Sequence, residues 1–191
     1  MFKLPHVIVF FVLALAPGAV GQQGEIVAWG SNGAGVVSNT PSSSDFVQVA
    51  SGDNHGLALK ADGSIISWGN DNDGQVSNTP PGTGFIQVAG GGDHSLALRA
   101  DGTIVAWGLD VSGQVSSTPT GNDFVQVAGG WRHSLALKTD GTIVSWGWNG
   151  YWQVSNTPSG AVFVQIAGGE RHSAALKSDG SLVSWGDNGD N

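Results

Sequence analysis

The sequence contains no cysteine, and only one methionine and one tyrosine, among its 191 residues. Without cysteine there is no disulfide framework and no thiolate site for metal or redox chemistry, so stability must come from packing. Basic residues are also scarce, because seven Lys and Arg stand against fifteen Asp and Glu and give a net charge of −8. No basic stripe is available to neutralise phosphates, and we therefore expect no nucleic-acid partner.

Long apolar runs are absent except at the N-terminus, where Val7 to Ala16 is preceded by Lys3 and followed by small residues that include Ala19 and Gly21. This pattern is typical of a secretory signal peptide, and the run is too short for a stable membrane span. We expect residues 1–21 to be a signal peptide cleaved before Gln22, and residues 22–191 to be secreted into an extracellular or periplasmic space. The alternative interpretation of the run is a buried N-terminal strand.

Glycine is abundant, and a set of framework residues recurs every 39 residues without a single insertion. The recurring positions are the histidines His55, His94, His133 and His172, the phenylalanines Phe46, Phe85, Phe124 and Phe163, and the Trp-Gly pairs at Trp29, Trp68, Trp107, Trp146 and Trp185. A fixed period near 40 residues indicates a repeat architecture.

The short-range pattern within one unit predicts β-strands. Leu135 and Leu137 alternate with smaller residues, and a tight-turn pair, Asp140-Gly141, separates them from a returning strand over residues 142–146. Residues 124–128 predict another strand, and Gln114 to Ser116 predict a short fourth one that ends before Thr118-Pro119. Four antiparallel strands in 39 residues are typical of one blade of a β-propeller, so we expect an all-β fold.

Four complete units start near residues 46, 85, 124 and 163, and a partial unit covers residues 24–45. The third strand of the unit therefore occurs five times and each other strand four times, so the two ends have no complementary strands to close a ring. We expect an open or incomplete propeller. Open ends leave sheet edges and apolar faces bare, which favours self-association.

Two stretches, Gly130 to Gly147 (GWRHSLALKTDGTIVSWG) and Trp68 to Gln75 (WGNDNDGQ), resemble the regulator of chromosome condensation repeat. The resemblance covers residues 24–191 and implies a β-propeller. Rings of that family usually have seven blades, about three more than the units found here. The signal-peptide pattern and the plain repeat tails resemble most the secreted bacterial members, one of which inhibits β-lactamases. The resemblance thus implies a role in regulating an enzyme by occlusion.

Catalytic and metal-binding interpretations find little support. The one histidine per unit indicates a structural imidazole bonded to neighbouring backbone, and the alternative is a metal site where equivalent histidines converge in a closed ring. The run Asp71 to Gly74 resembles a calcium loop but lacks the distal glutamate, which favours a solvated turn. Ser134, His133 and Asp140 have the residue types of a hydrolase triad, yet they recur as framework. We expect no enzyme activity, no metal and no cofactor.

The informative residues are those that depart from the repeat. Trp131 occupies a position held by Asp53, Gly92 and Glu170 in other units, and residues 148–152 place three aromatic rings where other units have mostly Asn, Asp, Ser or Gly. Both loops emerge at the same end of a four-stranded meander. Tyr, Trp and Arg dominate binding hot spots. The candidate binding surface therefore comprises Trp131, Arg132, Trp148, Tyr151, Trp152, Asp53, Asn54, Asp93, Glu170 and Arg171. The alternative is that the rings fill an irregular blade edge.

These patterns favour a secreted, non-catalytic module that binds another protein through one loop face. The second interpretation is a structural or assembly module within a larger cell-surface or extracellular protein. Regulation of an enzyme by occlusion is the third. Partner binding would depend on Trp131 and Trp152, whereas assembly would not.

Overall fold

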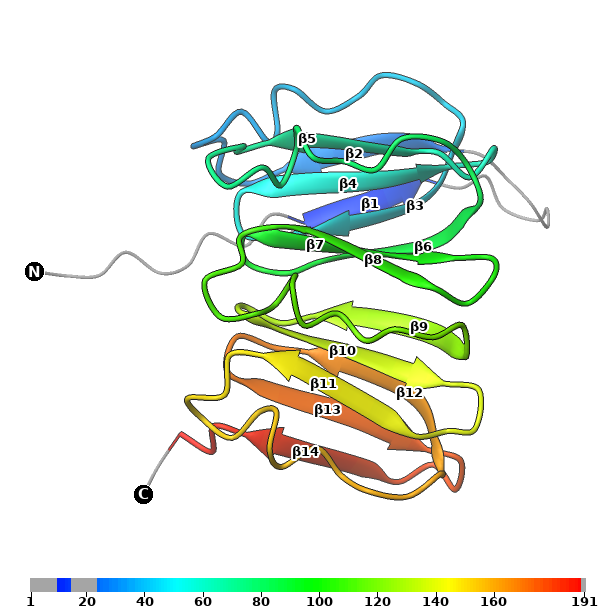
Figure 1. Cartoon of the computed structure of the whole chain (residues 1–191). Coiled ribbons are helices and arrows are strands. Elements are labelled where there is room, and N and C mark those ends of the chain that lie inside the picture. Colours follow the sequence, from blue (N-terminus) through cyan, green and yellow to red (C-terminus); the bar gives the residue numbers. More distant parts are fainter. Residues whose placement is uncertain (1–9, 15–23, 190–191) are drawn as a thin grey trace, which may run out of the picture.

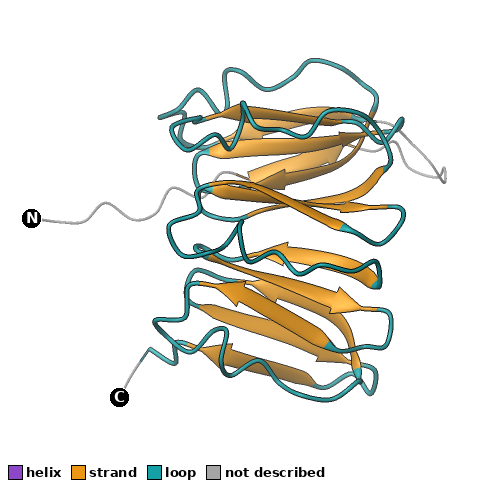
Figure 2. Cartoon of the chain, viewed as in Figure 1, coloured by secondary structure: helices purple, strands orange, loops and turns teal. Residues whose placement is uncertain are grey.

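A computed structural model describes residues 10–14 and 24–189, and Figure 2 shows that the regular structure within these ranges consists of strands. It contains no helix long and apolar enough to cross a membrane among the described residues. Four three-stranded antiparallel sheets correspond to the four complete units. They are β3 (Phe46–Ser51), β4 (His55–Lys60) and β5 (Ile65–Gly69); β6 (Phe85–Gly90), β7 (His94–Arg99) and β8 (Ile104–Gly108); β9 (Phe124–Gly129), β10 (His133–Lys138) and β11 (Ile143–Gly147); and β12 (Phe163–Gly168), β13 (His172–Lys177) and β14 (Leu182–Gly186).

The sheets stack in chain order, with the β3–β4–β5 sheet at one end and the β12–β13–β14 sheet at the other (Figure 1). Each unit packs on the next, and the described sheets do not close into a ring. The expected all-β fold, with repeated blades in an open arrangement, is confirmed.

The partial unit contributes β2 (Glu25–Trp29), which pairs antiparallel with β1 (Phe10–Ala14). Gly24 also bridges to Phe46 at the start of the first complete sheet. The signal peptide expected over residues 1–21 lies outside the described residues except for β1, which falls within its apolar run.

The expected fourth strand is wrong, because residues 114–116 and their equivalents form a turn. The Asp110 carboxylate accepts hydrogen bonds from the backbone N–H groups of Val115 and Ser116 at 2.9 Å. The Ser117 N–H then donates to the carbonyl of Gly113, whose φ of 78° suits glycine. This side-chain cap offers the backbone a local alternative to a sheet ladder, so the first three complete units each have three strands and a capped turn.

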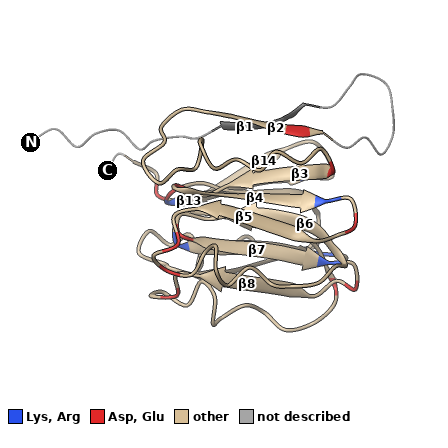
Figure 3. Cartoon of the chain, turned by 90° about the horizontal axis from the view of Figure 1, so that it is seen from above, with Lys and Arg blue, Asp and Glu red and all other residues tan. Residues whose placement is uncertain are grey.

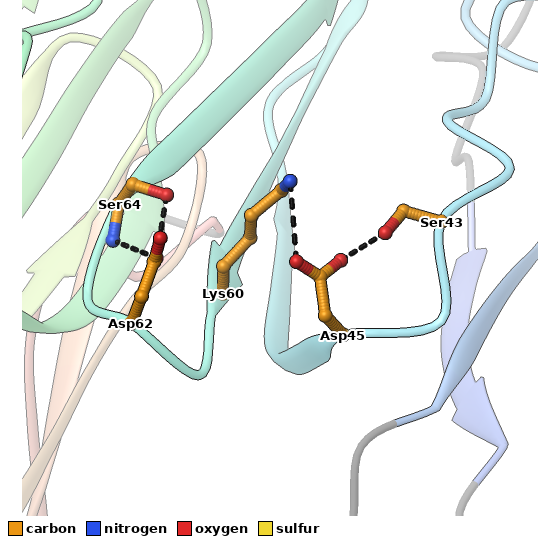
Figure 4. Close-up of polar contacts among 5 residues, drawn as sticks. All are labelled: Ser43, Asp45, Lys60, Asp62 and Ser64. Atoms are coloured by element: carbon orange, nitrogen blue, oxygen red, sulfur yellow. Dashed lines mark hydrogen bonds and ion pairs between the residues drawn. The ribbon is translucent and has the colours of Figure 1, made fainter.

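The tight turn between the second and third strands of each unit contains the expected Asp-Gly pair, in which the glycine has positive φ. In the first unit the Asp62 carboxylate accepts hydrogen bonds from Ser64 N–H at 2.8 Å and Ser64 Oγ at 2.6 Å (Figure 4). Beside this turn Lys60 forms an ion pair of 3.2 Å with Asp45, which also accepts a hydrogen bond from Ser43. The turns at Asp101, Asp140 and Asp179 repeat the same two bonds to the Thr or Ser two residues later.

The hydrophobic core lies between successive sheets. On β4, Leu57 and Leu59 face the next unit, where they form one cluster with Phe85 and Trp107, whereas Ala58 packs against the preceding unit. Successive side chains of a strand point to opposite faces of the sheet. The Leu-Ala-Leu alternation therefore places large side chains on the face toward the next unit and a small side chain on the face toward the preceding unit. The framework tryptophans also bond across units, as when Trp107 Nε1–H donates to the Gln75 carbonyl at 3.0 Å.

The framework histidines connect each unit to the next. His55, His94 and His133 are fully buried, and their Nε2 atoms lie 2.8–2.9 Å from the hydroxyl oxygens of Ser95, Ser134 and Ser173. The structural role expected for these imidazoles is therefore confirmed, but the expected backbone partner is wrong. The partner is a side chain one unit further along.

A second inter-unit connection comes from glutamine. The Gln87 side chain accepts a hydrogen bond from Val127 N–H at 2.9 Å and donates one to the Val127 carbonyl at 3.2 Å, and Gln48 and Gln126 repeat the arrangement. Glycine allows the backbones to approach, because a Cβ on Gly129 would overlap the Gly90 carbonyl of the preceding unit. Each junction thus combines apolar packing with directional bonds.

The buried histidines predict a characteristic loss of stability in mild acid. Burial lowers the pKa of His55 and His133 to about 4 and that of His94, which also senses its two histidine neighbours, to about 3. Unfolding restores a pKa near 6.5, so the unfolded chain binds more protons below that pH. The unfolding free energy should be constant above about pH 6.5 and fall towards pH 4, by up to about 1.4 kcal/mol per pH unit for each histidine.

Urea denaturation at a series of pH values between 7 and 4 measures this slope. Hydrogen bonds from neighbouring Ser or Thr groups lower the pKa of the turn aspartates, so their stabilisation is lost only below about pH 5 and does not affect the slope between about pH 6.5 and 5. A stability that stays flat between pH 6.5 and 4.5 would contradict the buried, neutral state of the three histidines.

Candidate functional site

Two loops of each complete unit meet at one end of its strands, so they line one side of the stack, as the sequence predicts. The loop after each Trp-Gly pair donates a backbone hydrogen bond to the loop before each framework histidine. Trp148 N–H bonds the Arg132 carbonyl at 2.8 Å, and Leu109 N–H bonds the Asp93 carbonyl at 2.8 Å. The same pairing joins Asn70 to Asn54 and Asp187 to Arg171. We call this side of the stack the rim.

The rim carries a connected series of rings and cations in the third and fourth units. Trp131 and Tyr151 each meet Trp148 in an edge-to-face contact, with centroid separations of 5.8 Å and 5.2 Å. Arg132 stacks over Trp131 at 4.3 Å, and Arg171 lies over Tyr151 at 4.9 Å. Arg171 also donates a 2.8 Å hydrogen bond to the Tyr151 hydroxyl, which ties the fourth unit to the third.

Three of the four rings are packed against one another rather than exposed. Trp131, Trp148 and Tyr151 are half-buried. Gly92 and Gly150 accommodate the two tryptophans, because a Cβ on either glycine would overlap an indole ring. These three rings therefore pack against one another at the blade edge, and Trp148 is half-buried.

Trp152 differs from the other three rings. Its side chain is 63% exposed, and its backbone has a φ of 59°, which makes it the one described non-glycine residue with positive φ. The equivalent positions in the preceding units are Gly35, Gly74 and Gly113, with φ of 71–78°. The turn thus requires a residue in the left-handed backbone conformation. This unit places an exposed tryptophan there, at an energetic cost.

Charges surround the rings at this end. Figure 3 shows charged residues mainly in the loops and at the strand ends. Burial raises the pKa of Asp93, and the nearby charge of Asp73 raises it further, while Arg132 opposes both. In the fourth unit Arg171 forms a 3.1 Å ion pair with Glu170. The positive charge of Arg132 thus acts on Asp93 of the second unit while its guanidinium stacks over the Trp131 indole.

The structure brings Arg132, Glu170 and Arg171 together with the rings and places Asp53 and Asn54 elsewhere on the rim. The Asp53 N–H donates to the Gly92 carbonyl of the next unit at 3.0 Å. Asn54 lines a shallow, open hollow of about 550 Å³ with residues 33–34 and 69–72. These two belong to the first unit, so the predicted surface has an aromatic part in the third and fourth units and a polar part in the first.

The geometry of the catalytic and metal candidates matches the framework roles expected for them. Ser134 bonds His94 rather than His133, and Asp140 caps its own turn, so the three residues form no triad. The Asp71 carboxylate accepts hydrogen bonds from Val76 and Ser77 N–H, which lower its pKa. Within residues 10–14 and 24–189, no three acidic, histidine or cysteine side chains cluster as metal ligands.

Two features of the rim escape the sequence analysis. The first is the strain at Trp152, which an alignment of the four turns would reveal as a Gly-to-Trp replacement. The second is the bond between Arg171 and Tyr151, which joins residues of different units. Gln75, Gln114 and Gln153 are also fully buried, and their side-chain oxygens accept backbone bonds inside the turn, so they act as framework.

Solved structures share this fold. The ectodomain of the receptor kinase CR4 from Physcomitrella patens is 24% identical, with a TM-score of 0.73 over 90% of this chain and 48% of that chain. Human WBSCR16 is 23% identical, with a TM-score of 0.73 over 94% of this chain and 60% of that one. Prp20p from Saccharomyces cerevisiae is 24% identical, with a TM-score of 0.68 over 85% and 54%. The chain thus spans about half the length of these proteins.

No curated protein matches the sequence. The model of the regulator of chromosome condensation (RCC1) repeat matches four times, at residues 46–75, 85–114, 124–153 and 163–191. These ranges begin at the four phenylalanines that open the complete units and together span more than half of the chain. The chain therefore belongs to the regulator of chromosome condensation (RCC1) repeat family.

Proposed function

We propose that the protein is a non-catalytic binding module that holds another protein against the aromatic part of its rim. The observation that carries the proposal is Trp152, an exposed ring on a strained turn. The fold does not require tryptophan there, since the other units build the same turn with glycine. Strain that has no structural benefit in the free protein is typical of functional sites.

The surroundings of Trp152 suit a binding anchor. Next to it Tyr151 is held in place by Arg171 and Trp148, so the loop has a rigid base. Rigid aromatic anchors bind at a low cost in conformational entropy, and a single one often contributes a large share of the affinity. The mechanism is occlusion of the partner by a preformed surface, with no bond made or broken.

Related proteins support a protein partner. Prp20p of yeast binds Gsp1p and histones, and it has been solved bound to Kap60. The net charge of −8 favours a partner surface that is neutral or basic over nucleic acid. An inhibitor that occludes an enzyme is one form of this proposal. A purely structural module would not need the strained ring.

The sharpest test replaces Trp152 with the residue that the other units use. Trp152→Gly relieves the strain, so the unfolding free energy should stay unchanged or rise by up to about 1 kcal/mol. The same change should weaken binding by about 2 kcal/mol or more if Trp152 is an anchor. Denaturant melts and capture of partners from the native secretome measure the two effects side by side.

Two matched variants serve as controls. Val111→Asn removes an exposed apolar side chain from the corresponding loop of the second unit, and Thr142→Ala changes a turn at the opposite end of the strands. Both should leave capture intact. Capture that survives Trp152→Gly but fails with Thr142→Ala would place the binding surface at the other end.

We further propose that the protein acts outside the cytoplasm, on the basis of the signal-peptide pattern in residues 1–21. Cleavage before Gln22 would remove β1 and leave β2 as the first strand. Mass spectrometry of the exported protein should find an N-terminus at Gln22. An exported or cell-associated protein that retains residues 10–14 would contradict cleavage and favour β1 as a permanent strand.

A further inference from the structure

The outer face of the last sheet exposes side chains whose equivalents in the earlier units are buried or half-buried. Leu182 on β14 is 74% exposed, whereas Ile65 and Ile143 at the equivalent positions are 9% exposed. Leu176 is half-buried, whereas its equivalent Leu137 is 4% exposed. In the inner units these forward-facing residues pack against the phenylalanine and tryptophan of the next unit.

The histidine and glutamine side chains of this face, whose equivalents bond the next unit, also have no described partner. His172 is exposed, although its equivalents are fully buried and bonded to serine. Gln165 is exposed as well, and no described residue supplies the backbone N–H and carbonyl that Gln126 finds on Ile166. We call this surface the end face, defined by Gln165, His172, Ala174, Leu176 and Leu182.

The opposite end of the stack is built differently. The position that holds Ser95, Ser134 and Ser173 in three units holds Gly56 in the first. No histidine precedes it at the equivalent position, where the sequence has Ala16. The serine is thus absent where no histidine requires it, while the histidine and glutamine of the end face are retained.

We propose that the end face is a docking site for a further unit of the same repeat. The occupant must supply three features that each inner junction already shows. These are a phenylalanine that covers Leu182, a serine hydroxyl for His172, and a first-strand backbone for Gln165. The docked unit would form the same junction that joins successive complete units, and the residues of the rim take no part in it.

A second copy of this chain does not offer these features. Its first complete unit carries Gly56 in place of the serine, and the partial unit covers that side, since Trp68 Nε1–H bonds the Val36 carbonyl at 2.8 Å. Its serines Ser95, Ser134 and Ser173 are already engaged by its own histidines. The complementary unit must therefore be one whose serine-bearing side is uncovered.

The test extends the full chain after Asn191 with a copy of residues 153–191, which keeps the 39-residue step. Broadening of methyl signals by a soluble paramagnetic probe reports the solvent exposure of Leu182. In the extended chain the broadening at Leu182 should fall to that of Ile143. It should fall less when the residue that copies Ser173 is glycine.

Histidine substitutions separate specific docking from general apolar contact. His172→Ala should leave the urea midpoint of the natural chain unchanged and lower that of the extended chain, because stability in such stacks depends on nearest neighbours. His133→Ala should lower both. Broadening at Leu182 that the extension leaves unchanged would overturn the proposal. So would a concentration-dependent dimer of the natural chain that protects Leu182, since the occupant would then be a second copy.

Discussion

The structure depends on a buried histidine that reaches a serine of the next unit. Burying an imidazole without a partner is costly, so each histidine requires its serine and each serine fixes where the next sheet lies. The hydrogen bonds from the glutamine side chain to the first strand of the next unit also fix where the next sheet lies. Because the three junctions between complete units repeat this geometry, the equivalent loops of those units line one side of the stack, and the rim is a consequence of the stacking.

Periodic residues made most of the fold predictable from the sequence. The alternation of Leu135 and Leu137 and the Asp140-Gly141 turn are local signals, and the structure confirms the strands that they predict. The prediction of a fourth strand was wrong because the Asp110 carboxylate accepts hydrogen bonds from the backbone of residues 115–116. These bonds compete with strand pairing, and the apolar pattern does not reveal them. The serine partner of His133 is 40 residues away and was not expected, although Ser173 recurs with the period.

The candidate site was predictable in position but not in detail. Meander topology places Trp131 and Trp148 at one end, and the rings do meet there. Which rings are exposed depends on Gly92 and Gly150, whose missing side chains let two indoles pack inward. Trp152 lies in a turn that requires a left-handed backbone conformation, and its side chain is exposed. The stack gives this ring a rigid base, and the strained backbone of Trp152 is the reason for proposing a binding role for its side chain.

A double-mutant cycle between His94 and Ser134 tests most directly whether the histidine–serine bond couples the units. Both residues are changed to alanine singly and together, and unfolding free energies are measured in urea. The account predicts a coupling within about 0.5–3 kcal/mol for this bonded pair and a coupling near zero for His94 with Ser173, which bonds a different histidine. Equal couplings for the two pairs, or no coupling for either, would contradict it.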